Sequence, residues 1–259
     1  MYVLLTDETN NQASVDVKFF AYGGLFFRFE LLPELDAAIR SIRSHFGFKP
    51  TDQFKFNIKS RPEGMDPKAH TAAKDAVLDL CIEKDCRFIS YVVHHAITNE
   101  EKAEERLTFA ADHILKAFHD FLDLSKDTGI VLMDSLPITK ADAYLRDKFQ
   151  VGLNYPKIGI KTPLHRIHLY GTTGIGMSHV ASMIDIVLGS FRYCINNPKN
   201  PVVADKLFKK VLQIMWYQEA DGKRTVNNRG LILRPKKVTN PEYRADYDSL
   251  IESLRTYAT

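Results

Sequence analysis

Three aspartates occupy positions where a charged side chain is unusual. Asp7 follows the apolar run of residues 2–5, and Asp134 ends a second apolar run. Asp185 lies in the middle of a mostly apolar segment, residues 178–196. Charged groups are rarely fully buried in proteins unless they are paired or bind a metal. The three acids could therefore converge on one cation.

A second acid, Glu8, directly follows the first of these aspartates. The apolar run before them predicts a buried strand, and the apolar run that begins at Val17 predicts its hairpin partner. Taken alone, Asp7 and Glu8 are best explained as turn formers, because Asp, Asn and Thr are common at strand ends. The repetition of the pattern at Asp134 and Asp185 is what favours a ligand.

The segment around Asp185 predicts a helix with one narrow polar stripe. The stripe has a member every three or four residues: Ser178, Ser182, Asp185, Gly189 and Arg192. Two explanations are equally good. In one, Asp185 pairs with Arg192 or joins a buried hydrogen-bond network. In the other, the acid binds a metal, the glycine permits close approach and the arginine contacts phosphate.

The remaining elements are predicted from the spacing of apolar residues and from helix end signals. Helices are expected at residues 31–46, 66–84, 99–125, 139–149, 202–217 and 241–257, a buried strand at 87–93, a strand ending at Asp134 and a short strand at 166–170. Residues 54–59 alternate strictly and predict a strand with Lys55 and Lys59 on its solvent face. Residues 151–164 are predicted as a loop, and 218–240 as a loop or hairpin.

No internal repeat or domain boundary is evident in the sequence. We therefore predict a single α/β domain over residues 1–259. Its core spans about residues 1–197, and helices and loops extend it over about residues 198–259.

The composition excludes a membrane span and a disulfide framework. No apolar run approaches the roughly 18 residues that a spanning helix needs. Cys81, Cys86 and Cys194 match no metal-binding spacing and are expected to be reduced thiols in a cytoplasmic protein. The net charge of +3 permits a phosphate-bearing partner without requiring one. Basic clusters at residues 206–210 and 234–237 are, by themselves, more simply explained as solvated faces.

Three other chemistries have little support. The glycine-rich turn at residues 171–176 lacks the lysine of a P-loop. His165 and His168 would lie on opposite faces of a strand, which is unsuitable for a shared zinc ion. The sequence contains no GxSxG motif and no cysteine at an obvious helix start with a histidine partner.

Five short motifs together resemble a family known as "domain of unknown function 3800". They are TDET (6–9), YGGL (22–25), QFKF (53–56), LMDS (132–135) and MIDIVLGSFRY (183–193). Their order and spacing run through most of residues 1–197. Two positions depart from the family pattern. Gln53 stands where a glutamate is usual, and Ser182 stands where a glutamine is common.

This resemblance implies an RNase H-like fold, with helices on a mixed central sheet. It also implies a divalent-metal-dependent nuclease of a kind discussed in defence against mobile elements. By the same resemblance, Asp7, Asp134 and Asp185 would be metal ligands, Glu8 a fourth acid or a supporting group, and Lys55 a neighbour of the scissile phosphate. Mg²⁺ or Mn²⁺ suits hard carboxylate oxygens. Two such ions about 3.5–4 Å apart could activate a water and stabilise the leaving oxygen.

Nucleic acid, either DNA or RNA, is then the expected partner. Lys55, Lys59 and Arg192 are the expected substrate-binding residues, and the lysine-rich C-terminal third is expected to add to a salt-dependent contact with the phosphate backbone.

Gln53 leaves a second class of function open. An RNase H-like module that has lost its fourth ligand could bind nucleic acid or a protein partner without cleaving anything. A hydrolase of small phosphorylated molecules would use the same acids. A homo-oligomer or a regulatory protein partner is compatible with each of these alternatives.

Overall fold

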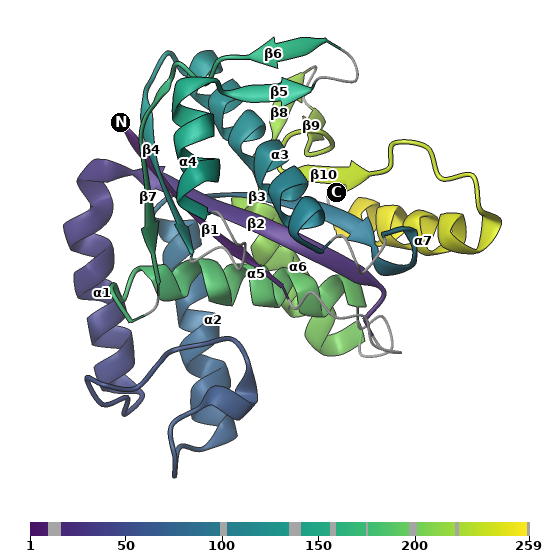
Figure 1. Ribbon diagram of the computed structural model, residues 1–259. Helices are drawn as coiled ribbons and strands as arrows, with labels where there is room; N and C mark the ends of the chain where they lie inside the picture. Colours follow the sequence, from purple (N-terminus) through teal and green to yellow (C-terminus); the bar gives the residue numbers. More distant parts are fainter. Residues whose placement is uncertain are drawn as a thin grey trace.

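A mixed six-stranded sheet forms the centre of the protein, and seven α-helices flank it in the part of the chain that the structure describes (Figure 1). The structure is a computed structural model. It describes residues 1–9, 17–98, 103–134, 141–155, 159–174, 176–196, 201–220 and 223–257. The predicted α/β class is therefore confirmed.

The sheet combines parallel and antiparallel pairs. Its strands follow the order β10 (Leu231–Arg234), β3 (Arg87–His94), β2 (Phe19–Arg28), β1 (Tyr2–Glu8), β4 (Gly129–Asp134) and β7 (Ile167–Thr173). Strand β2 is antiparallel to both β1 and β3. The pairs β1–β4, β4–β7 and β10–β3 are parallel. The carboxyl ends of β1, β4 and β7 consequently lie at the same edge of the sheet.

Two hydrophobic cores cover the two faces of this sheet. The first core includes side chains of α1 (Leu32–His45), α2 (Pro67–Glu83), α5 (Ala181–Asn196), α6 (Pro201–Ile214) and α7 (Pro241–Tyr257). The second core includes side chains of α3 (Ala103–Leu124) and α4 (Ala141–Gln150). Strand β1 alternates between them, because Val3 and Leu5 belong to the first core and Leu4 to the second.

The helix ends follow the sequence signals. Asp66 caps α2 by accepting a hydrogen bond from the backbone N–H of Lys68 at 3.0 Å, and Pro67 occupies the first turn. Gly47 follows α1 with φ +81°, a conformation that favours glycine. The predicted helices over residues 31–46, 66–84, 202–217 and 241–257 are thus present within a few residues of their expected bounds. Thr139, the first residue of the helix predicted over 139–149, lies outside the described residues.

The predicted strand at residues 54–59 is wrong. This segment is irregular and ends in the 3-10 helix η2 (Ile58–Ser60). Phe54 is buried against Phe48, with ring centroids 4.5 Å apart, and the backbone of Phe56 bonds to helix α5 instead of a neighbouring strand. Phe56 packs against Gly189 of α5, and Ile58 is exposed, so the alternating residues do not share one buried face. A period of two does not distinguish such a segment from a strand.

Two segments predicted as loops contain short strands. Residues 151–164 include the hairpin of β5 (Leu153–Tyr155) and β6 (Ile160–Thr162). Residues 218–240 include the expected hairpin, β8 (Gln218–Ala220) with β9 (Lys223–Thr225), and then β10. The two remaining 3-10 helices are η1 (Phe29–Leu31) and η3 (His95–Ile97). Among the described residues, no helix has both the length and the apolar character needed to cross a membrane.

Candidate functional site

Strands β1 and β4 bring Asp7 and Asp134 to neighbouring positions. The two strands are parallel, and Thr6 is paired with Met133, so the next residue on each strand is one of the two aspartates. Asp7 follows Leu5 with a period of two, and Asp134 follows Leu132 in the same way; both leucines pack in the first core. Both acids therefore belong to the face of the sheet that α5 covers.

Helix α5 supplies the third aspartate. It packs across β1 and β2 through a nearly continuous set of buried residues. Asp185 interrupts this apolar surface, and its Oδ2 atom accepts a hydrogen bond from the backbone N–H of Phe56. The fold thus joins three acids that are distant in sequence, since Asp7 and Asp134 are 127 positions apart and Asp134 and Asp185 are 51 positions apart.

The electrostatics of Asp7 shows that these acids act on one another. Burial raises the pKa of Asp7 well above its usual range, and the negative charges of Asp185, Glu8 and Asp134 raise it further. The N–H of Glu8 donates to Oδ1 of Asp7 at 2.8 Å and offsets only part of this effect. A cation at this position would relieve the mutual repulsion.

Asp185 is held in a mixed environment. Burial raises its pKa, and the hydrogen bond from Phe56 and the positive charges of Lys55 and Arg192 act in the opposite direction. The two explanations that the sequence left equal therefore both have some basis. Asp185 is in a hydrogen-bond network, and it also contributes to the negative potential at Asp7.

Glu8 lies at the same end of β1 as Asp7. Because side chains alternate between the two faces of a strand, Glu8 belongs to the face that the second core covers. It is paired with Tyr22 on β2, and the Tyr22 hydroxyl shares a hydrogen bond of 2.9 Å with the Thr6 hydroxyl. Burial, followed by the charge of Asp134, raises the pKa of Glu8 to about 7. Glu8 therefore flanks the three aspartates from the other side of the sheet edge.

Gly189 allows the segment that carries Lys55 to reach Asp185. A Cβ atom at Gly189 would lie 2.4 Å from Cγ of Phe56, which is too close for any side chain. The ring of Phe56 occupies that space one turn after Asp185 on α5. Gly189 thus permits close approach, as the sequence suggested. The group that approaches it is the side chain of Phe56.

Lys74 is a site residue that sequence reasoning missed. It extends from α2, donates from Nζ to the backbone O of Phe56 at 3.1 Å and lies 4.4 Å from the centre of the Phe56 ring. Burial lowers the pKa of Lys74, and the nearby charge of Asp185 partly reverses this. The sequence gives no sign of this contact, because lysines are common on the solvent face of amphipathic helices.

The other predicted cationic residues divide into two groups. Lys55 and Arg192 lie close enough to Asp185 to affect its pKa, whereas Lys59 is exposed on η2. In the predicted lysine-rich cluster, Lys206 pairs with Asp75 at 2.7 Å and Lys210 pairs with Asp79 at 2.6 Å. These ion pairs with α2 reduce the positive charge that this cluster offers to phosphate.

The glycine-rich turn after β7 lies against the acids. A Cβ atom at Gly174 would be 3.3 Å from Oδ1 of Asp134, so a small residue leaves this carboxylate room. The two positions that depart from the family pattern have different surroundings. Gln53 is exposed, and the buried hydroxyl of Ser182 donates to the backbone O of His179 at 2.6 Å.

The donor set has the chemistry of a divalent-cation site, because it consists of half-buried carboxylates that raise the pKa of one of their members. Within the described residues, no group of three or more His, Cys, Asp or Glu side chains is placed to hold a metal ion.

Comparisons with known proteins add no relative. No family model, no curated protein and no solved structure matches this chain. The resemblance to the "domain of unknown function 3800" family therefore stays a prediction from the sequence motifs.

Proposed function

We propose that the protein is a divalent-metal-dependent nuclease with an RNase H-like fold, in which Asp7, Asp134 and Asp185 are the metal ligands. One observation carries this proposal. Two parallel strand ends and one helix, distant in sequence, bring three acids to one face of the sheet, where burial and like charge raise the pKa of Asp7. Acids brought together so that they raise the pKa of one of their members are typical of functional sites.

The metal would be Mg²⁺ or Mn²⁺, because both bind carboxylate oxygens. When bound, it would supply Lewis-acid stabilisation and an activated water for phosphodiester hydrolysis. Asp7, Asp134 and Asp185 would hold it. Glu8 would hold or release a proton at the edge of the site, since its pKa is about 7.

Three cations support the choice of a phosphodiester substrate. Lys55 and Arg192 lie near Asp185, and Lys74 contacts the same Phe56 backbone that bonds to Asp185. A phosphate brought to the acids would meet these side chains, which would orient it and offset its charge. Lys59 is exposed on η2 and would contact the backbone farther from the acids.

The direct test is a cleavage assay on single- and double-stranded DNA, single-stranded RNA and an RNA/DNA hybrid, each with Mg²⁺, Mn²⁺ or EDTA. We expect metal-dependent cleavage that falls at least about a hundredfold in Asp7→Asn, Asp134→Asn and Asp185→Asn. Glu63→Gln, which neutralises an exposed acid, is the matched control and should cleave as the wild type does.

Retained cleavage in folded Asp134→Asn would refute the proposal. The circular dichroism spectrum and the melting temperature of each variant separate a loss of chemistry from a loss of fold. Hydrolysis of a small phosphodiester, with no cleavage of any nucleic acid, would instead favour a hydrolase of small phosphorylated molecules.

A non-catalytic binding module is the second candidate, and two observations favour it. Gln53 stands where the family pattern has an acid, and the described acids do not form a ready metal site. This candidate predicts nucleic-acid binding that is the same in Mg²⁺, Mn²⁺ and EDTA. It also predicts a melting temperature that divalent ions leave unchanged, whereas the nuclease should be stabilised by them.

A further inference from the structure

A separate pocket lies on the opposite face of the sheet from the three aspartates. Its volume is about 640 Å³, a size that falls within the roughly 300–1,000 Å³ of small-molecule sites. The first half of α3, the end of β3, strand β5 and the segment after β10 form its walls. Tyr91 and Val93, on its floor, belong to the second core.

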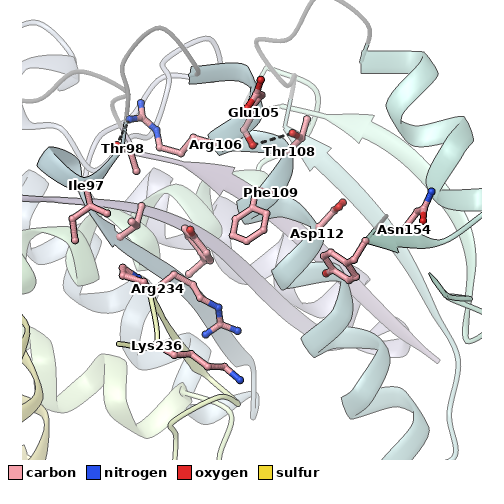
Figure 2. A pocket seen from close by; sticks show the side chains of 14 residues that line it. Ile97, Thr98, Glu105, Arg106, Thr108, Phe109, Asp112, Asn154, Arg234 and Lys236 are labelled. Carbon is pink, nitrogen blue, oxygen red and sulfur yellow. Dashed lines mark hydrogen bonds between the residues drawn. The ribbon is translucent and has the colours of Figure 1, made fainter. Parts of the chain in front are cut away.

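The pocket offers an aromatic surface that the core does not use. Phe109 is 45% exposed although it lines a concave site. Figure 2 shows its ring in the middle of the pocket. Tyr91 meets this ring edge-on at 6.1 Å between centroids, and Tyr155 lines the pocket from β5. An accessible aromatic face in a hollow is suited to stacking with a planar ring.

The pocket also contains a half-buried cation, and no acid among the described residues pairs with it. Arg234 donates from Nε to Nε2 of His113 at 3.2 Å and from Nη1 to the backbone O of Leu233 at 2.8 Å. Among the described residues, it forms no ion pair with a carboxylate. Burial lowers the pKa of Arg234. A desolvated guanidinium with unused donors favours an anionic ligand, above all a phosphate.

Two of the other charged lining residues, Lys236 and Asp112, support this conclusion, and the remaining two, Glu105 and Arg106, carry opposite charges. Lys236 is exposed two residues after Arg234 and lines the same pocket (Figure 2). Asp112, an acid in the wall, is already neutralised, because it accepts a hydrogen bond from the Tyr144 hydroxyl at 2.7 Å and pairs with Lys148 at 3.1 Å. The side of the pocket near Arg234 is therefore positive.

We propose that this pocket binds a nucleotide. The base stacks on Phe109 beside Tyr155, and the phosphate contacts Arg234 and Lys236. The ligand is a free nucleotide or the phosphorylated terminal nucleotide of a strand, since both present the same ring and phosphate. This site is independent of the proposed nuclease centre, because its residues lie on the other face of the sheet.

Isothermal titration calorimetry on the full chain tests the proposal. EDTA is present throughout, so that metal at the acidic cluster cannot contribute. The probes are AMP, UMP, adenosine, inorganic phosphate, and a short oligonucleotide with and without a 5′-phosphate. We expect AMP or the 5′-phosphorylated oligonucleotide to bind at least about tenfold more tightly than adenosine or phosphate alone, because ring and phosphate both contribute. Binding of AMP identifies a free-nucleotide site, and binding of the phosphorylated oligonucleotide alone identifies a strand-end site.

Variants locate the binding. Arg234→Gln and Phe109→Ala should each weaken it about tenfold, and Arg234→Gln should also remove the preference for the phosphorylated ligand. Phe149→Ala is the matched control for Phe109, since Phe149 is an aromatic residue that is 64% exposed and outside the pocket. Asp134→Asn should bind nucleotide as the wild type does, even if it abolishes cleavage. The proposal is overturned if no phosphorylated probe binds, or if binding survives both pocket variants.

Discussion

The backbone N–H of Phe56 donates a hydrogen bond to the carboxylate of Asp185, across 129 residues of sequence. This bond attaches an irregular segment to the middle of a helix and brings Lys55 next to the acids. It depends on a glycine one turn further along the helix, since Phe56 occupies the space of a side chain at Gly189. The acids and their basic neighbours are therefore coupled through packing as well as through charge.

Replacing Gly189 with alanine tests this coupling. Helix propensity alone would stabilise the variant by about 1 kcal/mol. The new Cβ atom would lie 2.4 Å from Phe56, however, and must displace it. We expect a net loss of about 1–3 kcal/mol in the free energy of unfolding, as in overpacked cores, measured by urea denaturation. Gly176→Ala, where a Cβ atom meets nothing within 4 Å, is the control and should change little.

Neutralising Asp7 should stabilise the protein while it removes the proposed nuclease activity. Burial and three neighbouring acids disfavour the charge of Asp7, so Asp7→Asn relieves repulsion. At pH 8 without divalent ions, we expect the free energy of unfolding of the variant to be about 0.5–2 kcal/mol higher than that of the wild type. Such a gain is typical when a residue that is retained for activity rather than stability is replaced. Thermal unfolding measures it. A clear loss of stability in Asp7→Asn would instead indicate that this acid serves the fold.

The pKa of Glu8 predicts a pH dependence of stability. Its value of about 7 in the folded state lies above the ordinary value of 4.5, so the folded chain retains a proton that the unfolded chain has lost. This contribution to stability is complete below pH 4.5 and disappears as the pH rises through 7. Glu8→Gln should therefore equal the wild type near pH 4.5 and exceed it at pH 8. Urea unfolding at both pH values, in EDTA, checks this; a stability difference that is independent of pH would contradict it.

His70 predicts a dependence of the opposite sign. It is fully buried between Phe48 and Phe54, and burial, with the charge of Lys74, lowers its pKa from 6.5 to about 4. The unfolded chain takes up this proton first, so the contribution to stability is complete above pH 6.5 and disappears as the pH falls through 4. Without this histidine, the free energy of unfolding should fall less between pH 7 and pH 4. We expect His70→Leu to reduce this fall by as much as about 3 kcal/mol. Urea midpoints between pH 4 and 7 measure the slope, and an unchanged slope would disprove the assignment.

Much of the framework around the acids follows from local sequence. The apolar runs before Asp7 and Asp134 form the two parallel strands, and the apolar helix around Asp185 covers them. These predictions succeed because a buried strand and a buried helix each need a continuous apolar surface, which a short window of sequence records. No short stretch of sequence, however, predicts that the acids lie close together. Their proximity follows from the parallel register of β1 and β4.

The failures have a common physical origin in long-range contacts. The segment 54–59 alternates like a strand, yet its partner is helix α5. Lys206 and Lys210 look like a basic patch until α2 supplies Asp75 and Asp79. Lys74 enters the site only because Phe56 is placed beside it. Each outcome depends on a partner more than ten residues away, and periodicity and composition carry no information about such partners.

Strand β10 has a consequence for how the chain folds. It pairs with β3 along one edge of the sheet, although about 140 residues separate them in sequence. Until residues 231–234 are synthesised, β3 presents an unpaired edge whose side chains are almost all buried in the finished protein. Exposed apolar edges of this kind pair readily with other chains. A chain truncated before β10 should therefore aggregate, and the last part of the polypeptide protects the sheet that the first part builds.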